Sequence, residues 1–190
     1  MRLMPTASQT VGPFFHLGCT RTHSVNCLAT QEAKGERVWL TCRVLDGDSV
    51  PVSDAMLELW QANAEGKYIH PDDPQDKPAD PHCSGFGRLA SDERGCCVFE
   101  TVRPGAVPGP DGTMQAPHIN VSVFARGIQK RLATRIYFFG DSANANDPVL
   151  AVVPEERRAT LMAQPDPQDV GSWNFTIRLC GENETVFFDV

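Results

Sequence analysis

The stretch QAPHINVSVFARG, residues 115–127, has the character of a loop that runs into a strand and ends on an arginine. Side chains alternate between the two faces of a strand, so His118 and Asn120 point the same way, in phase with Arg126. A His-x-His pair on one strand face is a natural clamp for a transition metal, but the neutral amide of asparagine competes poorly for such ions. The segment predicts a strand and leaves open a metal site, a lost metal site or neither.

Other segments of strand character lie before and after this one, separated by turn-forming sequences such as DGDSVP, RPG and PGPDG. They are found at residues 38–45, 55–62, 96–101, 132–139, 173–180 and 185–190. GENE, between the last two, predicts a hairpin there. Many short strands with turn-rich connections predict an all-β fold, specifically a β-sandwich.

One short helix is predicted over residues 154–163. Pro154 suits the first helical position, acidic residues favour the first turn, and Pro165 would end the helix. Residues 1–36 are expected to form an extended N-terminal arm and a surface loop, and residues 37–190 a single domain. Within the arm, the Gly-Pro corner of SQTVGPFFH (8–16) indicates a rigid segment that packs on its own core, on another chain or on a ligand.

The composition is that of a globular protein, with 190 residues of which 41% are hydrophobic and 22% charged. A net charge of -7 argues against nucleic-acid binding, because phosphates demand a basic face. No apolar run approaches the roughly 20 residues that span a bilayer, and the N-terminus lacks the apolar core of a secretory signal. Seven cysteines without a C-x-x-C pair favour free thiols in a reducing cytoplasm, with a zinc cluster as the alternative.

From the residues alone, no complete catalytic constellation is found, since nucleophile motifs and phosphate-binding glycine patterns are absent. A lone strand histidine such as His118 is more often hydrogen-bonded and structural than a metal ligand. The acidic loop at residues 70–85 lacks the ligand register of a calcium site, which favours a solvated loop. Arg126 could grip a carboxylate in a bidentate pair, or it could be a surface arginine paired with a neighbouring acid.

Six longer motifs, in order along the chain, resemble the intradiol ring-cleaving dioxygenases. These are SQTVGPFF, LELWQANAEGKYIHPDD, TVRPGAVPGPDG, APHINVSVFARG, TRIYFFGD and GENETVFFD. The resemblance runs from about residue 5 to the C-terminus and implies the β-sandwich of that family. It also implies oxidative cleavage of a catechol ring between its hydroxyl-bearing carbons by O2, with a non-haem ferric ion.

The same resemblance implies that the iron site is vestigial in this chain. Active chains of the family hold Fe(3+) through two tyrosines and two histidines. Tyr68 matches the first tyrosine and His118 the first histidine, whereas Asn120 stands at the second histidine and Val107 near the second tyrosine. Two further positions differ, with Gln115 in place of an arginine and Arg135 in place of a glutamine. No metal and no catalytic residue are therefore expected here.

What the resemblance implies instead is a non-catalytic alpha chain that pairs with an iron-bearing beta chain. Thr10, Gly12, Pro13 and Arg126 are the implied substrate-binding residues, reaching the beta-chain pocket. The implied substrate is 3,4-dihydroxybenzoate, cleaved to 3-carboxy-cis,cis-muconate. Two alternatives stay open, a self-sufficient metal-dependent dioxygenase built on Tyr68 and His118 and a purely structural β-sandwich subunit.

Overall fold

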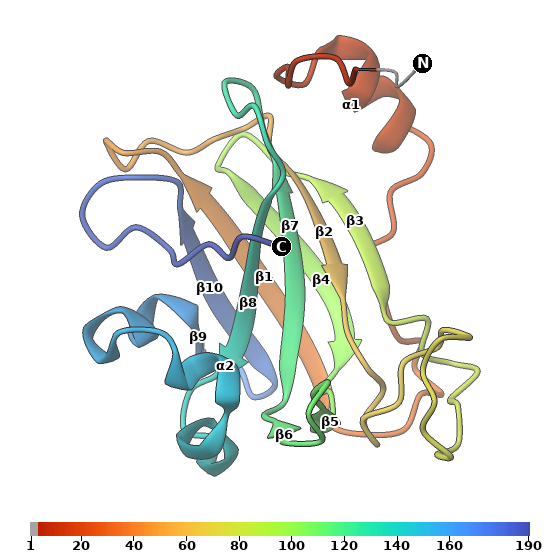
Figure 1. Cartoon of the computed structure of the whole chain (residues 1–190). Helices are drawn as coiled ribbons and strands as arrows, with labels where there is room; N and C mark the ends of the chain where they lie inside the picture. The colour runs from red at the N-terminus through yellow and green to blue at the C-terminus, as the bar shows by residue number, and fades with distance from the viewer. Residues whose placement is uncertain (1–3) are drawn as a thin grey trace.

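The computed structural model describes residues 4–190, which form one eight-stranded sheet folded back on itself. The strand order is β3-β2-β7-β8-β9-β10-β1-β4, and Figure 1 shows β2, β3, β7 and β8 facing β1, β4 and β10. Strand β9 joins the two halves, because it pairs in parallel with β8 and antiparallel with β10. The predicted β-sandwich is confirmed.

The bounds of the elements follow. The strands are β1 (Arg37–Leu45), β2 (Met56–Trp60), β3 (Phe86–Ala90), β4 (Cys96–Val102), β5 (Val107–Pro108), β6 (Met114–Gln115), β7 (His118–Phe124), β8 (Leu132–Phe138), β9 (Met162–Pro165) and β10 (Ser172–Arg178). The helices are α1 (Pro13–Cys19), α2 (Pro148–Ala151) and the 3-10 segments η1 (Ser142–Asn146) and η2 (Glu155–Leu161).

The core lies between the two halves of the sheet and is built by alternate residues of each strand. Leu40 and Cys42 of β1 are fully buried against a cluster that includes Leu57 of β2 and Ile119 of β7. The alternate residues of β1 point outward, and one of them, Trp39, is 42% exposed. A period of two therefore leaves the polar face of β7 on the outer side of the sheet.

A segment of the N-terminal arm closes the open side of the sandwich. The backbones of Val25 and Arg88 in β3 exchange two hydrogen bonds of 2.8 Å. Leu28 N donates to Glu100 O in β4, and Glu100 N donates to Asn26 O, again at 2.8 Å. One stretch of four residues thus satisfies backbone groups on both terminal strands of the sheet.

The helix predicted over 154–163 is wrong in type and extent. Residues Glu155–Leu161 form a 3-10 helix, and the chain enters β9 at Met162. Met162 pairs with Tyr137 of β8 and Leu161 is fully buried. Strand pairing and burial of this segment outweigh the local preference for an α-helix.

The predicted hairpin of residues 173–180 and 185–190 is also wrong. Thr185 N donates to Arg178 O at 3.0 Å, but beyond this contact the chain crosses to β8, where Phe188 N donates to Ala133 O at 2.8 Å. β1 already pairs with β10 along its length. Phe187 packs on the main apolar cluster, and Phe188 packs on a second apolar cluster that contains Tyr137 and Leu150. Burial of these two side chains favours the observed path of the chain.

Several elements were not expected from the sequence, namely α1, β3, β9, α2, η1 and the small β5-β6 ribbon. Residues Pro13–Cys19, predicted to be extended, form α1, with Pro13 at the first helical position. Phe15 of this helix packs on Phe124 at the end of β7, with ring centroids 5.4 Å apart. The short strand Phe86–Ala90 pairs with β2.

Within residues 4–190, no helix is long and apolar enough to span a bilayer.

Candidate functional site

Two groups of predicted site residues lie at opposite ends of β7. His118 begins the strand near β5 and β6, and Arg126 follows its far end, beside α1 (Figure 1). At about 3.3 Å per residue, β7 alone separates the two positions by about 20 Å. The chain therefore carries two separate candidate sites. The first is the group Tyr68, His118 and Asn120, named the relic metal pocket after the iron-ligand positions that the family resemblance assigns to them. The second is an arginine cleft around Arg126.

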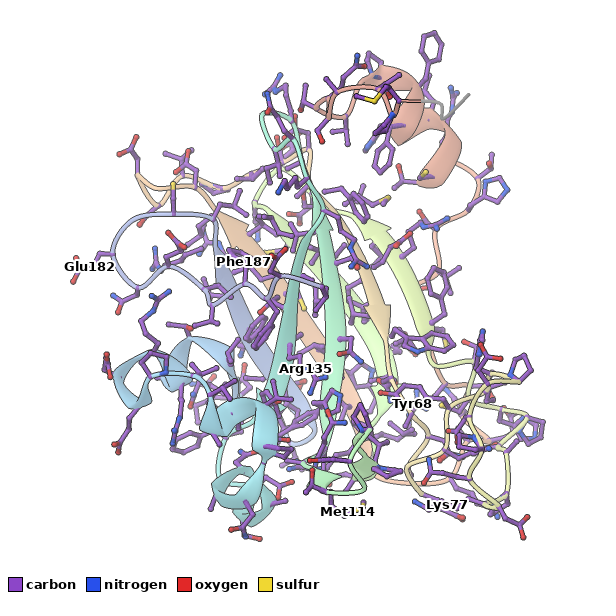
Figure 2. The ribbon with its side chains drawn as sticks, viewed as in Figure 1. Tyr68, Lys77, Met114, Arg135, Glu182 and Phe187 are labelled. Atoms are coloured by element: carbon purple, nitrogen blue, oxygen red, sulfur yellow. The ribbon has the colours of Figure 1, made fainter. Side chains whose placement is uncertain are left out.

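The relic metal pocket brings Tyr68 together with Asn120. Asn120 lies opposite Trp60 of β2, and its Nδ2 lies 3.4 Å from both the Tyr68 hydroxyl and the Trp60 carbonyl oxygen. The Tyr68 and Trp60 rings stack with centroids 5.8 Å apart and an interplanar angle of 13°. On the other side of Asn120, its partner in β8 is Arg135, which Figure 2 labels together with Tyr68. The amide at position 120 thus sits against the phenol.

His118 is held as a neutral, buried side chain. It is 3% exposed, and its Nδ1 makes a 2.7 Å hydrogen bond with Ala116 O, so Nδ1 carries the proton. Burial, with the Arg135 cation nearby, lowers the pKa of His118 to about 4. The Nδ1 atom of His118 is therefore occupied by a structural hydrogen bond.

A hydrogen-bond network extends from Arg135 into the second apolar cluster. Arg135 Nη1 donates to Gln115 Oε1 at 2.6 Å and lies 3.4 Å from the Tyr137 hydroxyl. The hydroxyl donates to Asp147 Oδ1 at 3.1 Å, and burial raises the pKa of Tyr137. Asp147 is 1% exposed and also accepts from Ala116 N, Val149 N and Leu150 N at 2.7–2.9 Å.

The residues of the relic metal pocket do not fit a ferric ion. Beside Tyr68 the second side chain is the neutral amide of Asn120, which competes poorly for a ferric ion, and its Nδ2 lies 3.4 Å from the Tyr68 hydroxyl. Val107, 3% exposed in β5, offers no donor atom. Across residues 4–190, no group of three or more His, Cys, Asp or Glu side chains could hold a metal ion.

The loop at residues 70–85 is more ordered than the solvated loop that the sequence favours. Asp73 accepts hydrogen bonds from Tyr68 N at 2.8 Å and Gln75 N at 2.9 Å, and lies 3.2 Å from Lys67 Nζ. Burial opposes ionisation of Asp73, but the bonds from Gln75, Tyr68 and Lys67 outweigh it and lower its pKa to about 2. Asp80, 8% exposed, accepts from Lys34 N and His82 N. These carboxylates shape the loop below Tyr68.

The arginine cleft collects the implied substrate-binding residues. Gly12, Pro13 and Arg126 line a cleft of about 440 Å3. Thr10 belongs to the same region, because Gly127 N donates to its Oγ1 at 2.8 Å. The Arg126 side chain is 81% exposed, and its Nε lies 3.1 Å from Asp54 Oδ2.

Two functional candidates were missed by sequence reasoning. Asp147 had a usable signal, since an aspartate before Pro148 is a typical start of a helix, and it does cap α2. Asp54 had none, because its contact with Arg126 joins turns that are distant in sequence.

Comparisons of the sequence with known proteins identify the family of this chain. A family model described as "Dioxygenase" matches residues 10–181. The protocatechuate 3,4-dioxygenase alpha chain of Burkholderia cepacia is 42% identical over 201 residues, covering 99% of this chain and 98% of that protein. The chain belongs to the intradiol dioxygenase family. The alpha chain of Pseudomonas putida is 41% identical, with coverage of 100% and 98%.

Other intradiol dioxygenases match over a smaller part or at lower identity. The protocatechuate 3,4-dioxygenase beta chain of Burkholderia cepacia is 39% identical over 141 residues, or 73% of this chain and 60% of that protein. Among solved structures, hydroxyquinol 1,2-dioxygenase of Pseudomonas putida DLL-E4 has a TM-score of 0.64 at 24% identity, covering 93% of this chain and 68% of that chain. The latter likeness shows the intradiol dioxygenase fold.

Proposed function

We propose that this chain is the alpha subunit of a protocatechuate 3,4-dioxygenase, paired with an iron-bearing beta chain. The observation that carries this proposal is the contact of the Asn120 amide with the Tyr68 hydroxyl at 3.4 Å, at two positions that the family resemblance matches with iron ligands. The chain is 42% identical to an alpha chain over almost its whole length, and it carries asparagine where the family resemblance places a histidine ligand. These two features are best explained if the chain is the partner of another chain that keeps the ligands.

The reaction proposed for the assembly is cleavage of 3,4-dihydroxybenzoate by O2 to 3-carboxy-cis,cis-muconate. Both oxygen atoms enter the product, so no external reductant is required. The ferric ion, in the partner chain, would supply activation of the bound catecholate towards O2. No step of this chemistry is assigned to Tyr68 or His118.

The contribution of this chain is to complete the substrate pocket. The exposed Arg126 guanidinium can form charge-assisted hydrogen bonds with the substrate carboxylate, which is the strongest kind of polar contact available here. Gly12 and Pro13 supply a wall whose backbone the proline ring restricts. Thr10 ties that wall to the turn that carries Arg126. Thr10, Gly12, Pro13 and Arg126 are the substrate-binding residues of this proposal.

The test is oxygen uptake with 3,4-dihydroxybenzoate, by the chain alone with added ferric iron and by the chain co-expressed with a beta chain. We expect turnover only in the co-expressed sample, with iron in proportion to the beta chain. Turnover and stoichiometric iron in the chain alone would overturn the proposal in favour of a self-sufficient dioxygenase. Unchanged kinetics on substitution of Thr10, Gly12 and Arg126 would favour a structural subunit. We also expect a cytoplasmic location, in keeping with seven free cysteines.

A further inference from the structure

Asp54 is the partner of Arg126 in the arginine cleft, and nothing in the proposed reaction accounts for it. It lies in the turn before β2, and its Oδ2 is 3.1 Å from Arg126 Nε. We infer that Asp54 is a positioning residue that aims the guanidinium of Arg126 at the carboxylate of the substrate, and so helps the assembly to prefer carboxylated catechols. This inference rests on the proposed function and deepens it.

The contact engages only one edge of the guanidinium. A guanidinium offers five N–H donors, and a carboxylate can be gripped by the two terminal nitrogens together. Asp54 Oδ2 forms an ion pair at the Nε edge, at 3.1 Å, and within residues 4–190 no other carboxylate lies at ion-pair distance from Arg126. The terminal edge of the fork is left available for a second carboxylate.

The backbone around Arg126 is fixed on both sides, whereas its side chain is not. Gly127 N donates to Thr10 Oγ1 at 2.8 Å, and Ile128 N donates to Ala125 O at 3.2 Å, which closes the turn. Gly127 has a φ of 85°, a conformation that suits glycine. The long side chain of Arg126 is 81% exposed, so without Asp54 it would sample many rotamers.

Asp54 is itself anchored by the residue that follows it. Ala55 is fully buried, its N–H donates to Ser91 Oγ at 3.1 Å, and its carbonyl accepts from Ser91 N at 2.8 Å. Apart from the ion pair with Arg126, the Asp54 side chain has no polar partner among residues 4–190, and it is 39% exposed. Its removal therefore leaves no buried group unsatisfied, and variants of Asp54 are expected to fold and assemble.

A carboxylate beside Arg126 could act in the opposite sense, by competing with the substrate carboxylate for the same cation. The two roles predict opposite signs. If Asp54 positions Arg126, its loss raises the KM for 3,4-dihydroxybenzoate, because substrate binding must then order a free arginine. If Asp54 competes, its loss removes a negative charge from the cleft and lowers that KM.

The experiment uses the assembled complex with Asp54→Ala, Asp54→Asn, Arg126→Ala and the double variant Asp54→Ala/Arg126→Ala. Asp54→Ala is expected to raise the KM for 3,4-dihydroxybenzoate by about threefold to tenfold with little change in kcat, the cost of ordering one long side chain. Asp54→Asn, which keeps an acceptor oxygen, should fall between wild type and Asp54→Ala. In the Arg126→Ala background, Asp54→Ala should have no further effect.

Two controls separate positioning from general effects. Asp48→Ala removes the same charge from the same connection between β1 and β2, at an exposed side chain, and should leave KM unchanged. The inhibition constant of catechol, which has no carboxylate, should not change in Asp54→Ala. Additive effects in the double variant, or a lower KM in Asp54→Ala, would overturn the inference while wild-type activity upholds the proposed function. No turnover of 3,4-dihydroxybenzoate by the wild-type complex would overturn both.

Discussion

Thr10 and Gly127, 117 positions apart in the chain, are joined by a hydrogen bond in which Gly127 N donates to Thr10 Oγ1 at 2.8 Å. This bond fastens the N-terminal arm to the turn that carries Arg126. Replacing Thr10 by alanine should weaken the attachment by about 1 kcal/mol, the net value of one hydrogen bond. We expect faster proteolytic cleavage within residues 4–19, while Thr10→Ser keeps the wild-type rate. Equal cleavage of all three proteins would show that the bond does not hold the arm.

Arg126→Ala should raise the KM of the assembled enzyme for 3,4-dihydroxybenzoate. Loss of a charge-assisted hydrogen bond of about 1.5–3 kcal/mol corresponds to roughly 10- to 100-fold. Arg126→Lys keeps the positive charge but not the planar guanidinium, so its KM should lie between those of the wild type and Arg126→Ala. Steady-state kinetics at fixed O2 measure the effect. An unchanged KM in Arg126→Ala would remove this residue from the substrate pocket.

Tyr68→Phe should leave the activity of the assembled enzyme unchanged. The hydroxyl makes only a 3.4 Å contact with Asn120 among residues 4–190, so its loss should change the free energy of unfolding by less than about 1 kcal/mol. Oxygen uptake and iron content, measured on the same preparation, check this. A loss of iron together with activity would mean that Tyr68 is a metal ligand after all.

Asp147→Ala should be strongly destabilising. The carboxylate is 1% exposed and accepts four hydrogen bonds, from Tyr137 and from the backbone of Ala116, Val149 and Leu150. Leaving these buried donors without an acceptor should lower the free energy of unfolding by about 3 kcal/mol or more. Denaturant unfolding measures the loss, and Glu156→Ala, at an exposed site, is the control. A change below 1 kcal/mol, on the order of a surface substitution, would contradict the network.

Acidification should destabilise the protein through His118. Its pKa falls from 6.5 to about 4 on folding, so between these values the unfolded chain binds more protons, and stability rises with pH across that window. Across the whole window the free energy of unfolding should change by about 3 kcal/mol. His118→Asn should flatten the dependence between pH 4 and 6.5, whereas His23→Asn, at an exposed position, should not. A wild-type slope retained in His118→Asn would assign the effect to another group.

The sequence predicts the strands with a regular period best. The segments at 38–45, 118–125 and 132–139 differ from β1, β7 and β8 by one residue at an end. Strand β3 was missed because Gly87 interrupts its pattern, yet that glycine is required by packing. A Cβ there would lie 2.5 Å from Leu28 Cδ1, in the segment that closes the sandwich. Such a requirement comes from a tertiary contact and leaves no trace in local periodicity.

For the candidate sites, too, the sequence predicts some features and misses those that depend on tertiary contacts. The strand pattern places His118 and Asn120 on one face, and the family resemblance adds Tyr68. What the sequence cannot supply is the pairing of groups from different turns, such as Arg126 with Asp54 or Thr10 with Gly127. These contacts depend on where loops end in space, and no period or motif records that.

The parallel pairing of β1 with β10 sets a limit on how this chain can fold. β1 lies between β4 and β10, so one of its edges is satisfied early in the sequence and the other only when residues 172–178 exist. During synthesis, the β1 edge must wait for almost the whole chain, exposing unpaired backbone and the apolar residues beside it. Contacts between segments so far apart in sequence are slow to form. A chaperone, or prompt capture by a partner subunit, would shorten that vulnerable interval.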